Sequence, residues 1–336
     1  YELINFLKKI NEIIIDNLEE IITFSVKNNK LNSLKYLENI GGFLNNVELL
    51  IVAEKGYLEM LKYFVNKDIY IQSGDFVKDE MLALSSKNGH LEIVQFLLEI
   101  DVYFSRGNLK AKALESASNN GHYEIVELLL KGKKNISAIN KALELASKNG
   151  YYEIVELLLK NGITWHVDKA LNLASKNGNY EIVELFLKNG INRSIDEALN
   201  LASENGHYEI VELLFKNKIT IYGKNIALKS ASKNGHYKIV ELLIKNGVDI
   251  SARNEASQTA AQKGHYKIVE LLLENGISTY AEHETLYFAS SNGHYEIVEL
   301  LLKNGVDNYV KKIALGLALK YGNYKIAELI KSNIDL

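Results

Sequence analysis

Apolar and polar residues follow one another along the chain with the period of short amphipathic α-helices. In residues 169–176 the spacing of small and branched apolar side chains predicts a short helix that buries one face. A second helix is expected over 180–188, with an apolar stripe made of Ile182, Val183, Leu185 and Phe186. Gly178 separates the two helices and Gly190 follows the second one, so the segment is predicted to be a helix hairpin.

The hairpin recurs along the whole chain. The segment Asn-Gly-His-Tyr-Glu-Ile-Val-Glu-Leu-Leu returns with little change every 28 to 33 residues, and its glycine stands at Gly56, Gly89, Gly121, Gly150, Gly178, Gly206, Gly235, Gly264, Gly293 and Gly322. Repetition at this period predicts an α-solenoid, in which each unit packs mainly on its neighbours. Asn29 stands where one more turn glycine would fall, and asparagine also tolerates a left-handed backbone.

Residues 1–336 are therefore interpreted as one array of about eleven repeats. The first residues, Tyr1-Glu2-Leu3-Ile4, match the start of a second helix, as at Tyr152-Glu153-Ile154-Val155. A partial repeat is therefore expected at 1–16, and we expect the sequence to be a fragment of a longer chain.

Small and polar residues at fixed places explain how the hairpins would stack. Alanine stands four residues before most turn glycines, as at Ala146, Ala174, Ala202 and Ala231. A methyl group there lets neighbouring first helices approach to about 8–10 Å. An aspartate or asparagine near the start of each first helix is predicted to be its N-cap, at Asn46, Asp79, Asn140, Asp168, Asp196, Asn225 and Asn254.

This pattern resembles the ankyrin repeat, whose first helix opens Thr-Pro-Leu-His-x-Ala and whose second opens near Gly-His. The leucine and alanine of that signature persist as Leu171 and Ala174, whereas its proline and histidine are replaced by Ala170 and Asn172. With its abundant asparagine, isoleucine, lysine and tyrosine, the array is most similar to the short-repeat ankyrin arrays of giant amoeba-infecting DNA viruses (Mimivirus-like).

Most units are shorter than the usual ankyrin repeat of about 33 residues. The missing residues fall between Gly162 and Asp168 and at the equivalent places, where ankyrin repeats usually form a β-hairpin finger. The fold is therefore predicted to be all-α, an ankyrin-type α-solenoid of stacked helix hairpins with shortened inter-repeat loops. Only the longer loops at 68–78 and 101–110 have room for a finger.

Composition narrows the classes of partner. The net charge is −3 and both signs are interspersed, so neither nucleic acid nor an anionic membrane surface is expected to bind. The chain has no cysteine, which excludes disulfides and thiolate metal sites. No apolar run reaches the roughly 18 residues of a membrane span. We expect a cytoplasmic protein, in the host cytoplasm if the viral resemblance holds.

Repeated polar residues are interpreted as scaffold. Histidine follows the turn glycine at His90, His122, His207, His236, His265 and His294. Zinc ligands must converge at about 2.0–2.1 Å from one ion, whereas residues one repeat apart are about 8–10 Å apart. These histidines are therefore predicted to form hydrogen bonds that stabilise the turns. Serines and tyrosines copied in every unit do not form a singular nucleophile and base, so neither enzyme activity, a cofactor, a metal nor a small-molecule substrate is expected.

The residues that vary lie between the repeats. Val167, Ile195, Ala252 and Val310 are predicted to face inward, which leaves the residues just before them free to face outward. Tryptophan, tyrosine and arginine dominate binding hot spots. The predicted partner-binding residues are accordingly Tyr103, Arg106, Trp165, His166, Arg193, Tyr222, Arg253, Tyr280 and Tyr309. The alternative is that some of these side chains only cover the edge of the core.

The sequence therefore predicts a non-enzymatic protein–protein interaction scaffold that binds a host or viral protein through its inter-repeat loops and first helices. One alternative is the substrate-recognition arm of a ubiquitin-ligase adaptor. Another is the repeat region of a larger enzyme or channel.

Overall fold

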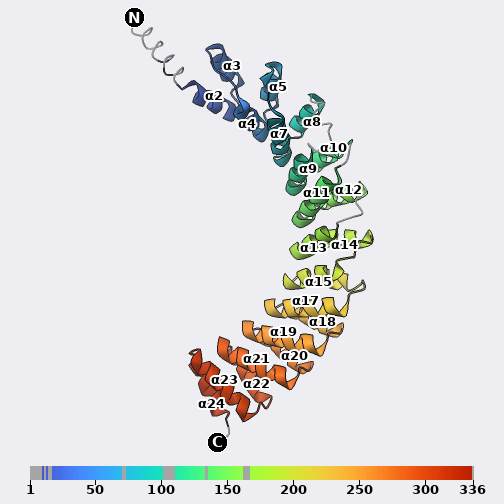
Figure 1. Cartoon of the computed structure of the whole chain (residues 1–336), viewed down its shortest axis with the longest axis vertical. Coiled ribbons are helices and arrows are strands. Elements are labelled where there is room, and N and C mark those ends of the chain that lie inside the picture. Colours follow the sequence, from blue (N-terminus) through green and yellow to red (C-terminus); the bar gives the residue numbers. More distant parts are fainter. Residues whose placement is uncertain are drawn as a thin grey trace. The chain divides into compact units, whose positions relative to one another are not determined.

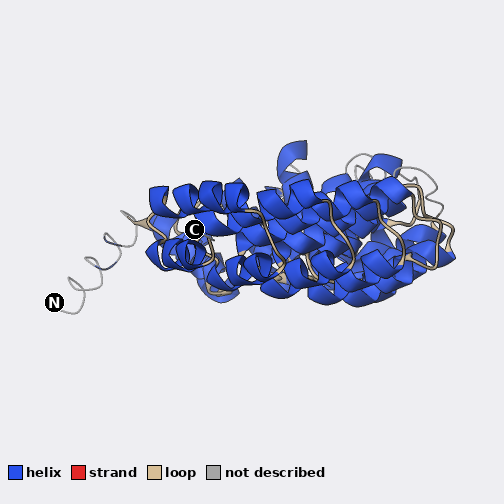
Figure 2. Cartoon of the chain, turned by 90° about the horizontal axis from the view of Figure 1, so that it is seen from below, coloured by secondary structure: helices blue, strands red, loops and turns tan. Residues whose placement is uncertain are grey.

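The computed structural model describes residues 10, 13, 17–69, 73–100, 110–132, 135–161 and 167–334. These ranges contain 22 helices. They contain no strand, and Figure 2 draws only helices and loops in them. The prediction of an all-α fold of stacked helix hairpins is therefore confirmed. None of the helices in these ranges is both long and apolar enough to cross a lipid bilayer.

The chain forms two compact units, Tyr1–Val167 and Asp168–Leu336, each built from helix hairpins. In the first unit, the first helices of the hairpins are α2 (Leu18–Lys27), α4 (Asn46–Lys55), α7 (Asp75–Lys87), α9 (Ala111–Asn120) and α11 (Ile136–Asn149). Their second helices are α3 (Leu31–Asn39), α5 (Leu58–Asn66), α8 (Leu91–Ile100), α10 (Tyr123–Leu129) and α12 (Tyr152–Lys160). Each first helix packs on the next one, so the first helices form one layer of this unit.

The second unit repeats the arrangement in two layers (Figure 1). One layer holds α13 (Asp168–Asn177), α15 (Ile195–Glu204), α17 (Ile221–Asn234), α19 (Ile250–Lys263), α21 (Thr279–Asn292) and α23 (Asn308–Lys320). The other holds α14 (Tyr180–Lys188), α16 (Tyr208–Leu214), α18 (Tyr237–Lys245), α20 (Tyr266–Glu274), α22 (Tyr295–Lys303) and α24 (Tyr324–Ser332).

The core lies between the two layers and at the seams between repeats. The alanines four residues before the turn glycines are fully buried, as predicted. The four residues predicted to face inward, Val167, Ile195, Ala252 and Val310, are also buried. In α14, Ile182, Val183 and Phe186 are buried, but Leu185 is only half-buried. Leu185 was therefore wrongly placed in the core, because it lies at the edge of the apolar stripe.

The turns follow the prediction. Gly178 and the equivalent glycines have positive φ, and Asn29 takes the same left-handed conformation with a φ of 54°. The histidine after each turn glycine reaches back to the preceding repeat, and the Nε2 of His236 lies 3.0 Å from the carbonyl oxygen of Glu204. The same contact is made by His90, His122, His207, His265 and His294. The prediction that these histidines stabilise the turns by hydrogen bonds is confirmed.

The N-cap prediction is wrong. In α17, α19 and α21 the helix begins about a turn earlier, after the N-cap residues Thr220, Asp249 and Ser278. The predicted N-caps consequently lie outside the N-cap position, at Asn46, Asp79, Asn140, Asp196, Asn225 and Asn254, and Asp168 is the first residue of α13. The earlier start places additional residues on the surface of the first-helix layer.

Candidate protein-binding surface

The structure describes five of the nine predicted partner-binding residues. Arg193 lies exposed in the loop before α15, as predicted. Tyr222, Tyr280 and Tyr309 were expected in loops, but each is the second residue of a first helix, in α17, α21 and α23. The other four, Tyr103, Arg106, Trp165 and His166, lie outside the described residues.

Arg253 does not lie in a loop either. It is the fourth residue of α19, and its guanidinium donates a hydrogen bond through Nη1 to the carbonyl oxygen of Asn275 at the end of α20. Lys224 and Lys311, which occupy the same place in their repeats, donate to the carbonyl oxygens of Asn246 and Asn333 at 2.8 Å. A cation at this position satisfies an orphan carbonyl at the C-terminus of the second helix. This half-buried arginine therefore has a structural role in its own repeat.

The exposed side chains gather at the first turns of the first helices. Tyr222 and Tyr280 are 70% exposed and Tyr309 is 73% exposed. The residue just before the tyrosine position is exposed as well at Ile221 and Ile250. We call these five residues, each the first or second residue of its first helix in successive repeats, the first-turn row. It is an apolar surface that no neighbouring repeat covers.

Local geometry explains why these residues point outward. The residue that follows the tyrosine position faces the core, as Gly223, Ala281 and Val310 do. Since the helix turns by 3.6 residues, the two residues before an inward-facing position of the first turn project away from the core. The residues of the row, which lie between the helices in the sequence-based prediction, are therefore held by the first turn of a helix.

Hydrogen bonds between repeats hold the first turns in register. Asn225 in α17 receives a hydrogen bond from the backbone N–H of Asp249 at 3.1 Å and donates to its carboxylate at 2.7 Å. Asn254 in α19 accepts from the backbone N–H of Ser278 at 2.9 Å and donates to its hydroxyl at 3.0 Å. Asn225 and Asn254, two of the predicted N-caps, thus bind the N-cap residue of the next repeat instead.

The same contact between α15 and α17 depends on a glycine. Asp196 accepts hydrogen bonds from the backbone N–H of Thr220 at 3.0 Å and from its hydroxyl. A Cβ at Gly223 would lie 2.5 Å from the carboxylate of Asp196, so any side chain there would displace it. Gly223 therefore allows the two first helices to be joined at this place.

An ion pair joins α17 to α19 beyond their first turns. Lys229 in α17 pairs with Glu255 in α19, with Nζ and Oε2 2.8 Å apart. Both side chains are about half exposed, so this pair contributes little to stability. The row itself consists of aromatic and apolar side chains, and tyrosine is enriched in protein-binding hot spots.

Ile221 and Ile250 are members of the row that sequence reasoning missed. Both are apolar residues in the segments between repeats from which the partner-binding residues are predicted. Had the helices been started after Thr220 and Asp249, which are good N-cap residues, both isoleucines would have fallen on an exposed face.

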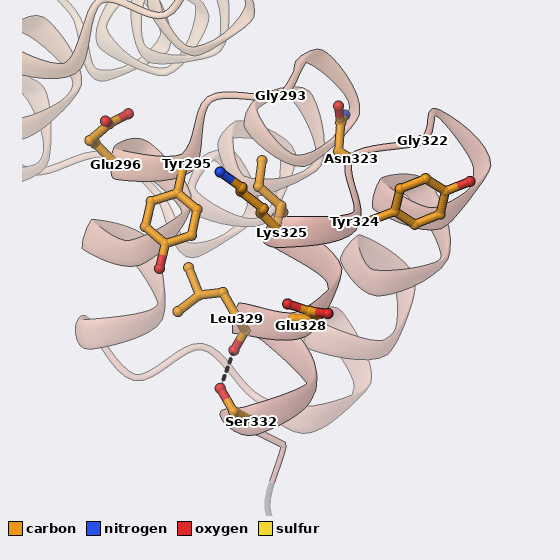
Figure 3. Close-up of a pocket in the computed structure, with 11 residues that line it drawn as sticks. Gly293, Tyr295, Glu296, Gly322, Asn323, Tyr324, Lys325, Glu328, Leu329 and Ser332 are labelled. Atoms are coloured by element: carbon orange, nitrogen blue, oxygen red, sulfur yellow. Dashed lines mark hydrogen bonds between the residues drawn. The ribbon is translucent and has the colours of Figure 1, made fainter.

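A hollow lies between α22 and α24 (Figure 3). It is lined by residues of the repeated turn and of the second helix, Gly293, Tyr295, Glu296, Gly322, Asn323, Tyr324, Lys325, Ile326, Glu328, Leu329 and Ser332. In Figure 3 the ring of Tyr324 points away from that of Tyr295 and the Ser332 hydroxyl donates to the Leu329 carbonyl oxygen. The residues that line the hollow recur at the same positions of other repeats. They do not form a singular set of convergent catalytic groups.

Metal ligands do not converge in the part of the chain that the structure describes, where no group of three histidine, aspartate or glutamate side chains could hold an ion. Six of the histidines are instead spread one per repeat, each with Nε2 at hydrogen-bond distance from a backbone carbonyl of the preceding repeat: His90, His122, His207, His236, His265 and His294.

Comparison with known families identifies the repeat. The family model described as ankyrin repeats (3 copies) matches residues 49–141, 108–169, 143–225, 171–254, 222–283 and 257–336. A comparison with curated proteins finds none that matches the chain. The matched segments run without a break from residue 49 to residue 336, over helix hairpins joined by left-handed glycine turns. The chain therefore belongs to the ankyrin-repeat family.

Proposed function

We propose that this protein is a non-enzymatic scaffold that binds a partner protein through the first-turn row of its second unit. Ankyrin repeats are generally protein–protein interaction modules. The observation that carries the proposal is the row itself, three tyrosines and two isoleucines that are half to three-quarters exposed at the first or second residue of successive first helices. Soluble proteins seldom expose aligned apolar side chains without a binding role.

The finer identity of the partner rests on the sequence resemblance. We propose that it is a host or virion protein in the cytoplasm of an amoebal host, in keeping with the similarity to the arrays of giant DNA viruses. The shortened loops and the asparagine- and lysine-rich composition support this origin.

Substitutions on the two layers test the proposal. Tyr222→Ala and Tyr309→Ala should each weaken partner binding by roughly 1–3 kcal/mol, if these tyrosines are hot spots. Because both side chains are exposed, the free energy of unfolding should change by no more than about 0.5 kcal/mol. The partner would be isolated by pull-down with the full chain, and its affinity for each variant measured by calorimetry.

Tyr324→Ala is the matched control. Tyr324 begins the second helix α24 and is 68% exposed, close to the 73% of Tyr309, but it lies at the hollow of the second-helix layer. We expect its replacement to leave binding unchanged. If Tyr324→Ala abolishes partner binding and the row variants still bind, the partner binds the second-helix layer, and the proposal is contradicted.

A further inference from the structure

The side chains around the first turn of α21 differ from the rest of the row. Tyr280, His283, Glu284 and Tyr287 follow one another at i, i+3, i+4 and i+7, so they share one face of α21. Tyr280 is exposed and the other three are half-exposed. This face therefore combines two phenol rings with a carboxylate and an imidazole.

Helix α23 packs beside α21 and adds to the same face. Its N-cap Asp307 accepts hydrogen bonds through Oδ1 from the backbone N–H groups of Tyr309 and Val310, at 2.9 and 3.0 Å. These bonds fix the carboxylate of Asp307 next to Tyr309, at the edge of α23. We call Tyr280, Glu284, Tyr287, Asp307 and Tyr309 the tyrosine–carboxylate cluster.

The α23 members of the cluster, Asp307 and Tyr309, stand at the N-terminus of the helix that packs on α21. Burial raises the pKa of the Tyr287 phenol, and Glu284, Tyr309, Asp307 and Tyr280 raise it further. The carboxylates of Glu284 and Asp307 supply the negative charge of the cluster.

The lysines of α23 do not neutralise the cluster. Lys311 donates to the carbonyl oxygen of Asn333 and so faces its own second helix. Lys312 stands at the position of Asn225 and Asn254, whose side chains reach toward the following repeat. Because Lys312 holds the same helix position as these asparagines, its side chain projects to the side of α23 that faces away from α21.

We infer that the tyrosine–carboxylate cluster binds a basic segment of the partner protein, with an arginine or lysine side chain lying on the tyrosine rings between Glu284 and Asp307. Aromatic rings attract a cation placed over their faces, and a nearby carboxylate adds charge complementarity. The inference rests on the proposed function, because it names the chemistry of the partner at one part of the first-turn row.

The probe is a fluorescently labelled peptide of alternating arginine and glycine, titrated into the full chain and followed by anisotropy. Tyr280→Ala should weaken its binding about two- to fivefold, the loss expected for one exposed cation–π contact. The pair Glu284→Gln and Asp307→Asn should weaken it by about the same factor, and asparagine preserves the N-cap of α23. The affinity should fall as the salt concentration rises.

Two controls separate the possible outcomes. Tyr324→Ala, on the second-helix layer and 68% exposed, should leave peptide binding unchanged, and a peptide with glutamate in place of arginine should not bind. Equal loss with Tyr324→Ala, or equal binding of the acidic peptide, would overturn the inference. Failure of the arginine peptide to bind while the natural partner still depends on Tyr222 would overturn this inference and leave the proposed function standing. If no substitution in the row weakens binding of the natural partner, the proposed function is overturned instead.

Discussion

At the scale of the residue, the position after each turn glycine connects one repeat to the one before it. Histidine occupies it most often, but Tyr57 donates to the carbonyl oxygen of Lys27 at 3.1 Å and Asn323 to that of Ser291 at 3.0 Å. In each case the acceptor lies two residues before the left-handed residue of the preceding turn. A Cβ at Gly206 would lie 2.6 Å from the ring of His236. Glycine is thus required there both by its φ of 81° and by the close approach of the imidazole.

A second residue-scale contact is made by three of the four first helices α17, α19, α21 and α23. Lys224, Arg253 and Lys311 each donate to a carbonyl oxygen at the end of their own second helix, but the equivalent residue in α21 is Glu282. Its carboxylate carries the wrong sign for the C-terminus of α22. Glu282→Lys should supply the missing donor to Asn304 and stabilise the protein by about 0.3–1 kcal/mol, measured by urea denaturation.

Glu282→Gln separates charge removal from the new hydrogen bond. The glutamine removes the unfavourable carboxylate, but it cannot provide a cation, so we expect a smaller gain than with lysine. Equal stability of the glutamine and lysine variants would show that the position does not act through the helix C-terminus.

At the scale of the element, the stacking of hairpins makes the cost of a cavity depend on the number of neighbours. Ile239 in α18 and Ile326 in α24 hold the same position of their repeats and are 1% and 3% exposed. Helix α18 packs on α16, α17 and α20, whereas α24 packs on α22 and α23. Ile239→Ala should therefore cost roughly 2–5 kcal/mol, and Ile326→Ala less, because only one neighbouring repeat packs on α24.

Denaturant unfolding of the two variants checks this expectation, with hydrogen exchange of the α24 amides to detect local opening of the last hairpin. The alanine side chain is the same in both variants, so the comparison isolates the effect of the neighbours. Equal losses of stability would contradict a solenoid in which stability is the sum of repeat and interface contributions.

At the scale of the whole molecule, the repeat pattern was sufficient to predict the hairpins, the turns and the buried seams. These features depend on local spacing and on residues that recur in every unit, so each copy supports the same interpretation. Asn29, for example, was identified from its place in the period alone, and its φ is positive.

The start of the first helices could not be predicted in the same way. The sequence offers two N-cap candidates in each of these repeats, such as Thr220 and Asn225. The choice between them is made by a contact with the neighbouring repeat, where Asn225 binds Asp249. The role of Arg253 was hidden for a similar reason, because its acceptor, Asn275, is brought close only by the folding of the hairpin.

The central claim is that the first-helix layer, and not the second-helix layer, binds the partner. A photo-crosslinking amino acid placed at Tyr222, Tyr309 or Tyr324 tests it most directly, in an extract of the cells in which the protein functions. Tyr309 and Tyr324 are matched in exposure but lie on different layers. We expect the same partner to be crosslinked from positions 222 and 309 and not from 324. A partner crosslinked from position 324 alone would contradict the account.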